Sequence, residues 1–509
     1  MTVAIGGALA FDDVRRVAVE GEEVAVAPGV WERLDRARDV VERAVRSEAP
    51  VYGISTGIGD LANVRIPTDD ATALQRDLVR SHATAAGPPL PQEVVRAMML
   101  LKARTFALGA SGVRRVLVER LVQLLNHRIH PVVPAQGSLG ASGDLALLAH
   151  LALPLLGEGE VEQGGRLRPA AEALRDAALV PLELSHKEGL SLVNGTEAML
   201  ALGILGYLRA ERLALAADIT GGMSVEGLLG TDRAFDDDLI ALRAHPGARA
   251  VARNLRTMLQ GSAIVASHRD SDHLVQDAYS LRCIPQVHGA YRDAMAYVRE
   301  TLENEMASAI DNPSVLVERE EVLSGGNFHG EALGLAMDHL ALCVTGYATI
   351  AERRVARLVD PHLNNGLPAF LTEDPGRRSG FMIAQYTAAS LVGESRSMSF
   401  PASTDTIPTS AGQEDHVSMG ATSARRTWSV LDNSEHVIAI EALAAAQALD
   451  LRGLEPAAGT AAARRLVRSI SPRLREDRPL APDIAALRRS IARGDLAAAV
   501  ADAGVGPLD

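Results

Sequence analysis

The sequence predicts a mainly α-helical protein, and three observations support this fold class. Hydrophobic residues make up 47% of the 509-residue chain, whereas aromatic residues make up only 3%. A core built mainly from Ala, Leu and Val suits closely packed helices better than an aromatic-rich β-sandwich. Long segments also place apolar residues at helical spacing, and the alternation typical of strands is scarce. We therefore expect long helices to form most of the core.

Helices and Gly-rich loops alternate in the first part of the chain. Residues 31–47 place apolar side chains at helical spacing among charges, which predicts an amphipathic surface helix. The Gly-rich segment VYGISTGIGD follows it. Residues 92–127 carry helical patterns that Gly109 and Gly112 interrupt. The chain then reaches a second Gly-rich segment, QGSLGASGDLALLAH, at residues 136–150.

Helical patterns dominate the remainder of the chain. The longest are expected at residues 197–219, 291–309, 331–358 and 435–451. The Ala- and Arg-rich tail from Ala457 predicts short peripheral helices. Because a chain of 509 residues exceeds the usual size of one core, its length predicts two or three domains, or one elongated architecture, and we expect two domains. Residues 1–195 should form an N-terminal domain with the Gly-rich loops, and residues 196–509 a long-helix bundle domain.

Composition argues against several classes of partner. The formal net charge of -13 disfavours a nucleic-acid partner, which needs a basic surface. Cys283 and Cys343 are the only cysteines, too few for a disulfide framework, as expected in a reducing cytoplasm. The apolar runs that begin at Leu145 and Ala198 are too short or too interrupted to span a membrane. We expect a cytoplasmic protein with no nucleic-acid or membrane partner.

The Gly-rich segments do not match common phosphate-binding or nucleophile motifs. Gly53, Gly57 and Gly59 lack the dinucleotide-binding spacing, and no Gly-Lys-Ser/Thr follows either segment. A serine-hydrolase nucleophile elbow needs glycine two residues after Ser142, where Asp144 stands. Taken alone, these glycines predict tight connections between elements.

Two clusters of metal-ligand residue types lack the spacing of a known zinc or calcium motif. These are His268, Asp270, Asp272 and His273 in the first cluster, and His329 with Glu331 in the second. We expect no metal site, and solvated or hydrogen-bonding roles for the first cluster. Glu414, Asp415 and His416 lie in the polar loop TSAGQEDHVSMG, where a functional role and a structural role are equally open.

The second Gly-rich segment carries a family resemblance. GSLGASGDLALLAH resembles the prosthetic-group motif of the aromatic amino acid ammonia-lyases and aminomutases. Further landmarks of that family are similar to VYGISTGIGDLA, SLVNGTEAM, QDAYSLRCIPQ, DNP, LSGGNFHG and QEDHVSMG, in the same order across residues 50–420. RSHATAAG and QEDHVSMG resemble the histidine enzymes of the family more than the phenylalanine or tyrosine enzymes. The resemblance implies a fumarase/aspartase-like fold with a long central helical bundle.

The resemblance implies an electrophilic prosthetic group made from the chain itself. Eliminating ammonia from an α-amino acid needs an electrophile that captures the amine, and no ordinary side chain is a strong one. By the resemblance, the amide nitrogen of Gly143 attacks the Ala141 carbonyl, and loss of two waters turns Ser142 into an exocyclic methylene. The product is 4-methylideneimidazol-5-one (MIO). Glycine suits the tight turn at Gly143, and Asp144 is expected to assist the proton transfers.

Other catalytic and binding residues follow from the same resemblance. Tyr52 should remove the β-proton, and because free tyrosine has a pKa of about 10 it needs neighbouring donors or positive charge. Arg282 should bind the substrate carboxylate through its planar guanidinium. Phe328 should pack beside MIO and help to exclude water. Tyr279 and Asn194 should line the amine side and the MIO oxygen, with Gln276 nearby. Tyr279 is also expected to be catalytic.

His82 and Glu414 bear on the choice of substrate. An imidazole ring offers one donor and one acceptor, so a buried site that matches both rejects a phenyl ring. We expect these two residues to bind an imidazole, and Glu414 also to take part in catalysis. The sequence departs from the histidine enzymes at Ser55 and Gly412, where those enzymes usually have Asn, so the pocket shape is expected to differ.

The resemblance therefore predicts an ammonia-lyase acting on an aromatic L-amino acid, with L-histidine converted to trans-urocanate. The alternatives are a phenylalanine or tyrosine ammonia-lyase and a MIO-dependent 2,3-aminomutase, which differ only in the ring pocket and the fate of the intermediate. A rival of another class, a non-catalytic helical assembly protein, predicts neither MIO absorbance nor turnover. The resemblance also implies a homotetramer in which each active site draws residues from three chains.

Overall fold

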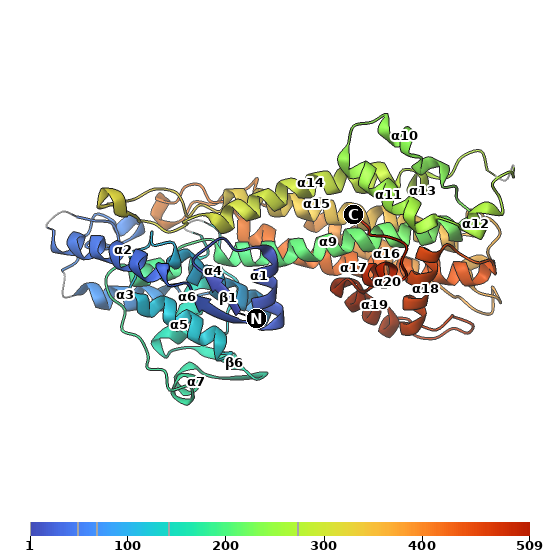
Figure 1. The fold of residues 1–509 in the computed structure, drawn as a ribbon. Helices are drawn as coiled ribbons and strands as arrows, with labels where there is room; N and C mark the ends of the chain where they lie inside the picture. Colours follow the sequence, from blue (N-terminus) through green and yellow to red (C-terminus); the bar gives the residue numbers. More distant parts are fainter. Residues whose placement is uncertain (1, 48–49, 68–69, 141–142, 272–273) are drawn as a thin grey trace. The chain divides into compact units, whose positions relative to one another are not determined.

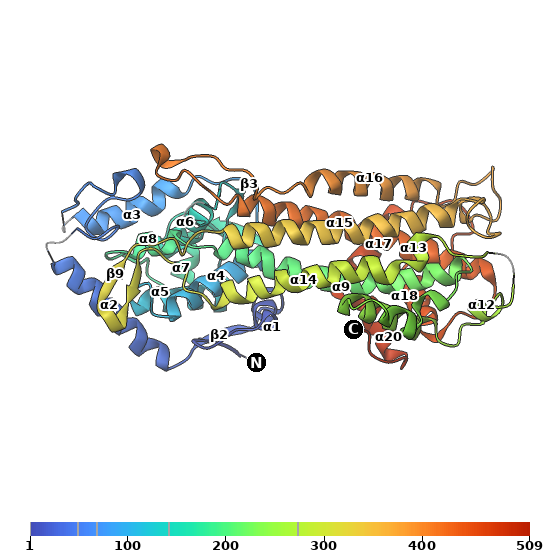
Figure 2. The same ribbon diagram turned by 90° about the horizontal axis from the view of Figure 1, so that it is seen from above.

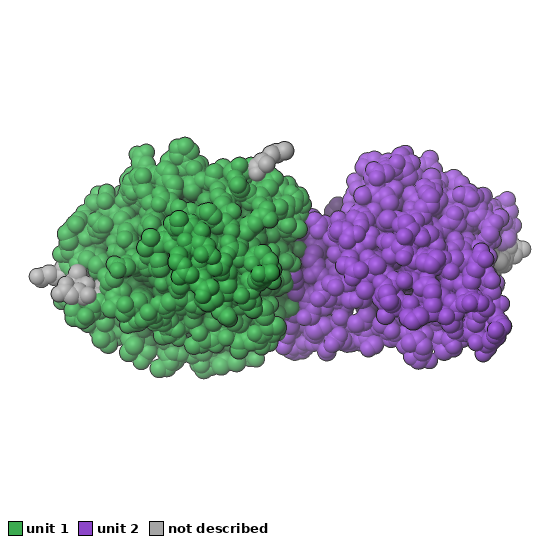
Figure 3. Space-filling view, turned by 90° about the horizontal axis from the view of Figure 1, so that it is seen from below, with its two compact units in different colours: residues 1–205, 299–338, 401–425 green, residues 206–298, 339–400, 426–509 purple. Residues whose placement is uncertain are grey.

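The structure of the protein is a computed structural model, which describes residues 2–47, 50–67, 70–140, 143–271 and 274–509 (Figure 1). The chain forms two compact units whose segments alternate along the sequence (Figure 3). The first unit comprises Met1–Leu205, Arg299–Asp338 and Pro401–Arg425. The second comprises Gly206–Val298, His339–Phe400 and Arg426–Asp509. The domain boundary expected after residue 195 stays a prediction.

Helices predominate in the first unit, in agreement with the fold class that the sequence predicts. They are α1 (Phe11–Arg15), α2 (Gly29–Arg46), α3 (Ala71–His82), α4 (Gln92–Ala107), α5 (Arg115–Asn126), α6 (Leu145–Ala152), α7 (Ala170–Asp176) and α8 (Glu188–Val193). Helix α2 buries its apolar face, as its amphipathic pattern predicts, and Leu34 and Val41 are fully buried. The loop between α4 and α5 contains Gly112, where a Cβ would lie 2.3 Å from Cγ2 of Val41.

Short strands form four small sheets in the first unit. The pairs are β1 (Thr2–Ile5) parallel to β2 (Glu23–Val26), β3 (Ala86–Pro89) antiparallel to β5 (Pro134–Gln136), and β8 (Ser314–Leu316) antiparallel to β9 (Glu321–Leu323). A three-stranded antiparallel sheet contains β4 (His130–Pro131), β6 (Glu160–Gln163) and β7 (Arg166–Pro169). Because β5 ends at Gln136, the β3–β5 pair anchors the start of the second Gly-rich segment.

Four long helices have residues in both units. They are α9 (Glu197–Gly227), α14 (Ile284–Ala307), α15 (Glu331–Val359) and α17 (Gly420–Arg452). Within the second unit they lie side by side (Figures 1 and 2). Close approach of α14 and α15 requires Gly346, where a Cβ would lie 2.0 Å from Cζ of Tyr291. Arg354 of α15 forms a fully buried ion pair with Glu441 of α17, which also accepts a 2.7 Å hydrogen bond from Thr220 of α9.

Shorter helices complete the second unit. They are α10 (Asp237–Ala241), α11 (Pro246–Leu259), α12 (Ala263–Ala266), α13 (Tyr279–Arg282), α16 (Met382–Met398), α18 (Ala458–Ile470), α19 (Ala481–Arg493) and α20 (Asp495–Asp502). The last three are the short helices expected in the C-terminal tail. Helix α15 is long and apolar enough to cross a membrane, by length and composition alone. However, 72% of its most apolar stretch is buried inside the structure. It therefore resembles a core helix.

Candidate active site

Four of the predicted site residues line one cavity of about 390 Å³ in the first unit. Tyr52 lies in the loop after α2, and His82 is the last residue of α3. Asn194 directly follows α8, and Glu414 lies in the loop before α17. The apolar part of the lining includes Leu145, Leu190 and Val193. The cavity thus joins four segments that are far apart in the sequence.

The first Gly-rich segment holds Tyr52 in place. Gly53 has φ +64, and a Cβ there would lie 2.2 Å from Cδ2 of Leu190, so only glycine allows the loop to pack against α8. The backbone N–H of Gly59 donates a 3.1 Å hydrogen bond to the Tyr52 hydroxyl oxygen. The loop therefore returns on itself and supplies a donor to the phenol.

His82 presents an acceptor to the cavity. Its Nδ1 lies 2.9 Å from the Leu78 carbonyl oxygen, which can only accept, so Nδ1 carries the hydrogen and Nε2 is the acceptor of the neutral ring. Burial lowers the pKa of His82, although the Leu78 carbonyl and the Glu414 carboxylate oppose this shift. Glu414 accepts a 2.7 Å hydrogen bond from Thr409 Oγ1. A neutral imidazole and a carboxylate therefore line the same space.

The described parts of the second Gly-rich segment, on either side of residues 141 and 142, are tightly packed. Gly143 has φ +76, and a Cβ there would lie 2.0 Å from the Gly195 carbonyl oxygen. Gly140 has φ +70, and its Cβ would lie 2.1 Å from Ser418 Oγ. Ser138 Oγ accepts a 3.1 Å hydrogen bond from the Gly140 N–H. Two of the predicted site residues, Ala141 and Ser142, lie outside the described residues.

Asp144 connects this segment to the N-terminus of α9. Its side chain is fully buried, and it accepts 2.9 Å hydrogen bonds from the backbone N–H groups of Ala198 and Met199. Ser138 Oγ donates a third hydrogen bond at 3.0 Å. Burial raises the pKa of Asp144 to about 7, against the opposing effect of these hydrogen bonds. The carboxyl group can therefore hold or release a proton near neutral pH.

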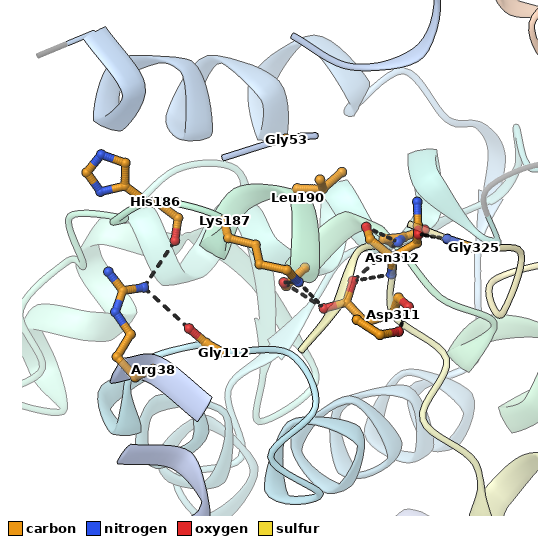
Figure 4. A network of polar contacts seen from close by, with 12 residues as sticks. Arg38, Gly53, Gly112, His186, Lys187, Leu190, Asp311, Asn312 and Gly325 are labelled. Atoms are coloured by element: carbon orange, nitrogen blue, oxygen red, sulfur yellow. Dashed lines mark hydrogen bonds and ion pairs between the residues drawn. The ribbon is translucent and has the colours of Figure 1, made fainter. Parts of the chain in front are cut away.

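Asn194 contacts a buried network around Lys187 and Asp311, which Figure 4 shows, and neither of these two residues is among the predicted site residues. Its Nδ2 donates to Asp311 Oδ1 at 3.2 Å and to the Asn312 carbonyl oxygen at 2.9 Å. Asp311 forms a 2.7 Å ion pair with Lys187, and both side chains are buried. The DNP motif marked the position of Asp311, but its partner is 124 residues away, so spacing in the sequence could not identify the pair.

The other predicted site residues lie elsewhere. Gln276, Tyr279 and Arg282 belong to the second unit. The Arg282 guanidinium lies 4.6 Å from the centre of the Tyr279 ring, and its Nε donates to the Asp277 carbonyl oxygen at 3.0 Å. Phe328 belongs to the first unit and is half-buried, outside the set of described residues that line the cavity.

The structure places no group of three or more His, Cys, Asp and Glu side chains in a metal-binding arrangement among the residues it describes. In the first cluster considered above, His268 Nδ1 is 2.9 Å from the Ile264 carbonyl oxygen and Nε2 is 3.2 Å from that of Gly230. Asp272 and His273 lie outside the described residues. His268 thus has a hydrogen-bonding role in the second unit.

The sequence and the structure of this chain are similar to those of known enzymes. Residues 9–469 match the family model described as aromatic amino acid lyase. A curated protein of Sorangium cellulosum named histidine ammonia-lyase is 50% identical, over 99% of this chain and 100% of its own length. The solved histidine ammonia-lyase from Trypanosoma cruzi has a TM-score of 0.91 and 39% identity, covering 99% of this chain and 96% of that chain. The solved tyrosine aminomutase from Streptomyces globisporus has a TM-score of 0.95 and 37% identity, covering 100% of both chains.

Proposed function

This chain belongs to the aromatic amino acid lyase family, and on that premise we propose that it removes ammonia from L-histidine to give trans-urocanate. The 50% identity to a histidine ammonia-lyase, over 99% of this chain, supports this substrate. The reaction breaks the Cα–N bond and removes one β-proton. The electron pair of the broken C–H bond forms a Cα–Cβ double bond conjugated with the imidazole ring.

The observation that carries the choice of L-histidine is the pair of acceptors in the cavity. A substrate imidazole can donate a ring N–H to His82 Nε2 or to the Glu414 carboxylate, and the protonated ring can donate to both. A phenyl ring has no donor, so the half-buried Glu414 carboxylate, which accepts from Thr409 Oγ1, would receive no hydrogen bond from the substrate. Sites built to hydrogen-bond a substrate group reject analogues that lack that group strongly. This pocket therefore favours histidine over phenylalanine.

The residues around the second Gly-rich segment fit the formation of MIO from Ala141-Ser142-Gly143. The space beside Gly143 is filled by Gly195, so the turn accepts only a residue without a side chain at this position. Asp144, whose pKa is about 7, can take up and deliver protons during the loss of two waters. When formed, this group supplies the electrophile that captures the substrate amine.

The chain's own side chains then bind the substrate and move its proton. Tyr52 acts as the base in its deprotonated form and takes the β-proton, and the Gly59 N–H stabilises the negative charge that the phenolate oxygen carries before this transfer. Asn194 offers its amide oxygen to the substrate ammonium. Arg282 binds the carboxylate, and the Tyr279 ring against which it lies restricts its orientation. The remaining roles, for Gln276 beside the amine and Phe328 in water exclusion, stay as predicted from the sequence.

Intact-mass measurement tests the prosthetic group. The purified chain is expected to be lighter than its sequence mass by two waters. Ser142→Ala removes the hydroxyl that leaves as water, so this variant is expected to keep its full mass and to lose turnover. Gly143→Ala is expected to behave in the same way, because its Cβ would collide with the Gly195 carbonyl oxygen, 2.0 Å away.

Gly165→Ala is the matched control for Gly143→Ala. Gly165 has the same φ of +76 but has no atom within 4 Å of the added Cβ. Its substitution imposes similar backbone strain in open space, so the mass loss of two waters is expected to persist. An unaltered chain of full mass with normal turnover would refute the MIO assignment.

A second candidate is a MIO-dependent aminomutase, because the solved tyrosine aminomutase matches the whole chain with a TM-score of 0.95. An aminomutase returns the amine to the β-carbon, so it yields a β-amino acid and little free ammonia. Ammonia released in equal amount to the acrylate product distinguishes the lyase from this alternative.

A further inference from the structure

The Asn194 side chain is held in one orientation. Its Nδ2 donates to two acceptors, Asp311 Oδ1 at 3.2 Å and the Asn312 carbonyl oxygen at 2.9 Å, which uses both amide hydrogens. Its Oδ1 is buried and has no hydrogen-bond partner among the residues that the structure describes. Asn194 also lines the cavity, although only 3% of its surface is exposed. An unpaired acceptor therefore remains on a residue of the cavity wall.

The backbone of Asn194 is fixed as well. Lys102 Nζ donates to the Asn194 carbonyl oxygen at 2.6 Å, and the Asn194 N–H donates to the Leu190 carbonyl oxygen at 3.0 Å. Lys102 is itself buried and forms a 3.0 Å ion pair with Glu197. Since the backbone cannot move freely, the direction of the amide depends on rotation about its last side-chain bond. That rotation exchanges the oxygen and the nitrogen.

Asp311 determines which of the two atoms faces it. The Lys187 ammonium lies 2.7 Å from Asp311 Oδ2, and Ser191 Oγ donates to the same oxygen at 2.7 Å (Figure 4). Burial opposes the charge of Asp311, but Lys187 and these hydrogen bonds hold its pKa below the ordinary value. An ionised carboxylate only accepts hydrogen bonds, so the Asn194 amide must turn its NH₂ group toward Asp311.

We propose that Asp311, held by Lys187, is a positioning residue that keeps the Asn194 oxygen, rather than its nitrogen, toward the substrate ammonium. The proposal rests on the proposed ammonia-lyase function and adds a residue to that same site. A cationic amine is attracted by an amide oxygen and repelled by an amide NH₂ group. The buried ion pair thus sets the donor and acceptor pattern of the amine-binding wall without contact between Asp311 and the substrate.

Asp311→Asn tests this proposal with little change of shape. Lys187 and Ser191 attract the oxygen of the new amide, which turns its NH₂ group toward Asn194 and toward the Asn312 N–H, the second donor to Asp311 Oδ1 in the unaltered chain. We expect Asn194 to rotate so that its oxygen accepts this hydrogen bond, at the cost of its 2.9 Å hydrogen bond to the Asn312 carbonyl oxygen, and to turn its NH₂ group toward the substrate. We expect the variant to bind ligands that carry an ammonium group more weakly and to bind ligands without one unchanged.

Binding is measured in the Ser142→Ala background, where the substrate is expected to bind without reacting. The two ligands are L-histidine and 3-(imidazol-4-yl)propionate, which share the ring and the carboxylate and differ by the ammonium group. Isothermal titration calorimetry should show that Asp311→Asn raises the Kd of L-histidine about tenfold or more, as expected for loss of a charged hydrogen bond. The Kd of the propionate should change less than twofold.

Glu188→Gln is the matched control, because Glu188 is a fully buried carboxylate on α8 that pairs with Arg114. Its removal tests the effect of losing a buried charge near Asn194, and the ratio of the two Kd values should stay unchanged. Equal weakening of both ligands by Asp311→Asn, or no weakening of either, would overturn the proposal. Where Asp311→Asn does not fold, Lys187→Gln replaces it and should give a smaller loss that is again selective for L-histidine.

The test separates this proposal from the proposed function. Turnover of L-histidine by the unaltered chain tests the function, whereas the ratio of the two Kd values tests the role of Asp311. If the unaltered chain turns over tyrosine instead, the same comparison applies with tyrosine and 3-(4-hydroxyphenyl)propionate. A selective loss of ammonium recognition would then support Asp311 even though the choice of histidine had failed.

Discussion

The carboxyl group of Asp144 should make the stability of this fold depend on pH. It is fully buried, and its pKa is raised to about 7. An unfolded aspartate loses its proton near pH 4, so between about pH 4 and pH 7 the native state binds more protons than the unfolded state. The contribution of Asp144 to the free energy of unfolding therefore falls as pH rises through this interval, by on the order of 4 kcal/mol in total.

Thermal unfolding of the unaltered protein and of Asp144→Asn tests this dependence. The difference in Tm, unaltered minus variant, should fall between pH 5 and pH 7 and become constant above that range. Asp35→Asn is the control, because its Arg115 partner lowers the pKa of Asp35 and places its titration below the measured range. A difference for Asp144→Asn that rises with pH would contradict the buried, largely protonated state.

Single residues also show how far the sequence could predict the site. The motifs indicated Tyr52, His82, Asn194 and Glu414, and these four line one cavity. Their residue types and surrounding landmarks are local in the sequence, so a motif can identify them. The positioning residues were not identified, because a buried lysine such as Lys187 becomes meaningful only beside its distant carboxylate partner.

At the scale of elements, the long helices rich in apolar residues were predicted well. Helices α9, α14 and α15 contain most of the ranges expected at 197–219, 291–309 and 331–358. Helix α17 begins at Gly420, well before the expected residue 435, and α16 (Met382–Met398) was not expected. The buried face of α16 consists of Ala384, Ala388, Val392 and Ser395, which are too small to give a clear apolar pattern.

Elements also explain why the site could be only partly derived from the sequence. Tyr52, Asn194 and Glu414 lie in loops, whose paths depend on close packing rather than on periodicity. The position of Gly53 against Leu190, for example, follows from a contact between segments distant in the sequence. Periodicity can place helices, but it cannot show which loops meet at their ends.

At the scale of the whole molecule, the distribution of site residues and apolar surface favours self-association. Tyr52 belongs to the first unit and Arg282 to the second. Large apolar side chains are exposed on and beside α16, including Ile383 at 59%, Tyr386 at 61% and Phe400 at 71%. Such exposure is typical of surfaces that bind another protein. We propose that the chain forms a cytoplasmic homotetramer whose active sites combine residues from three subunits.

Complementation tests the shared sites. Tyr52→Phe and Arg282→Ala should each be nearly inactive alone, because each loses one catalytic or binding group. Co-expression of the two variants with different affinity tags allows mixed tetramers to be purified. These should regain activity at a minority of sites, which draw both intact residues from different chains. If verified mixed tetramers stay as inactive as their parents, the two residues act within one chain and the sharing is wrong.

Elimination of ammonia from L-histidine is the reaction that we propose for this chain. It is tested most directly by incubating the purified protein separately with L-histidine, L-phenylalanine and L-tyrosine, and by measuring both ammonia and the conjugated acrylate products. We expect urocanate and ammonia in equal amounts from L-histidine, with turnover of the other two lower by a factor of about a hundred or more. Preferential formation of cinnamate or coumarate, or of a β-amino acid without equivalent ammonia, would contradict it.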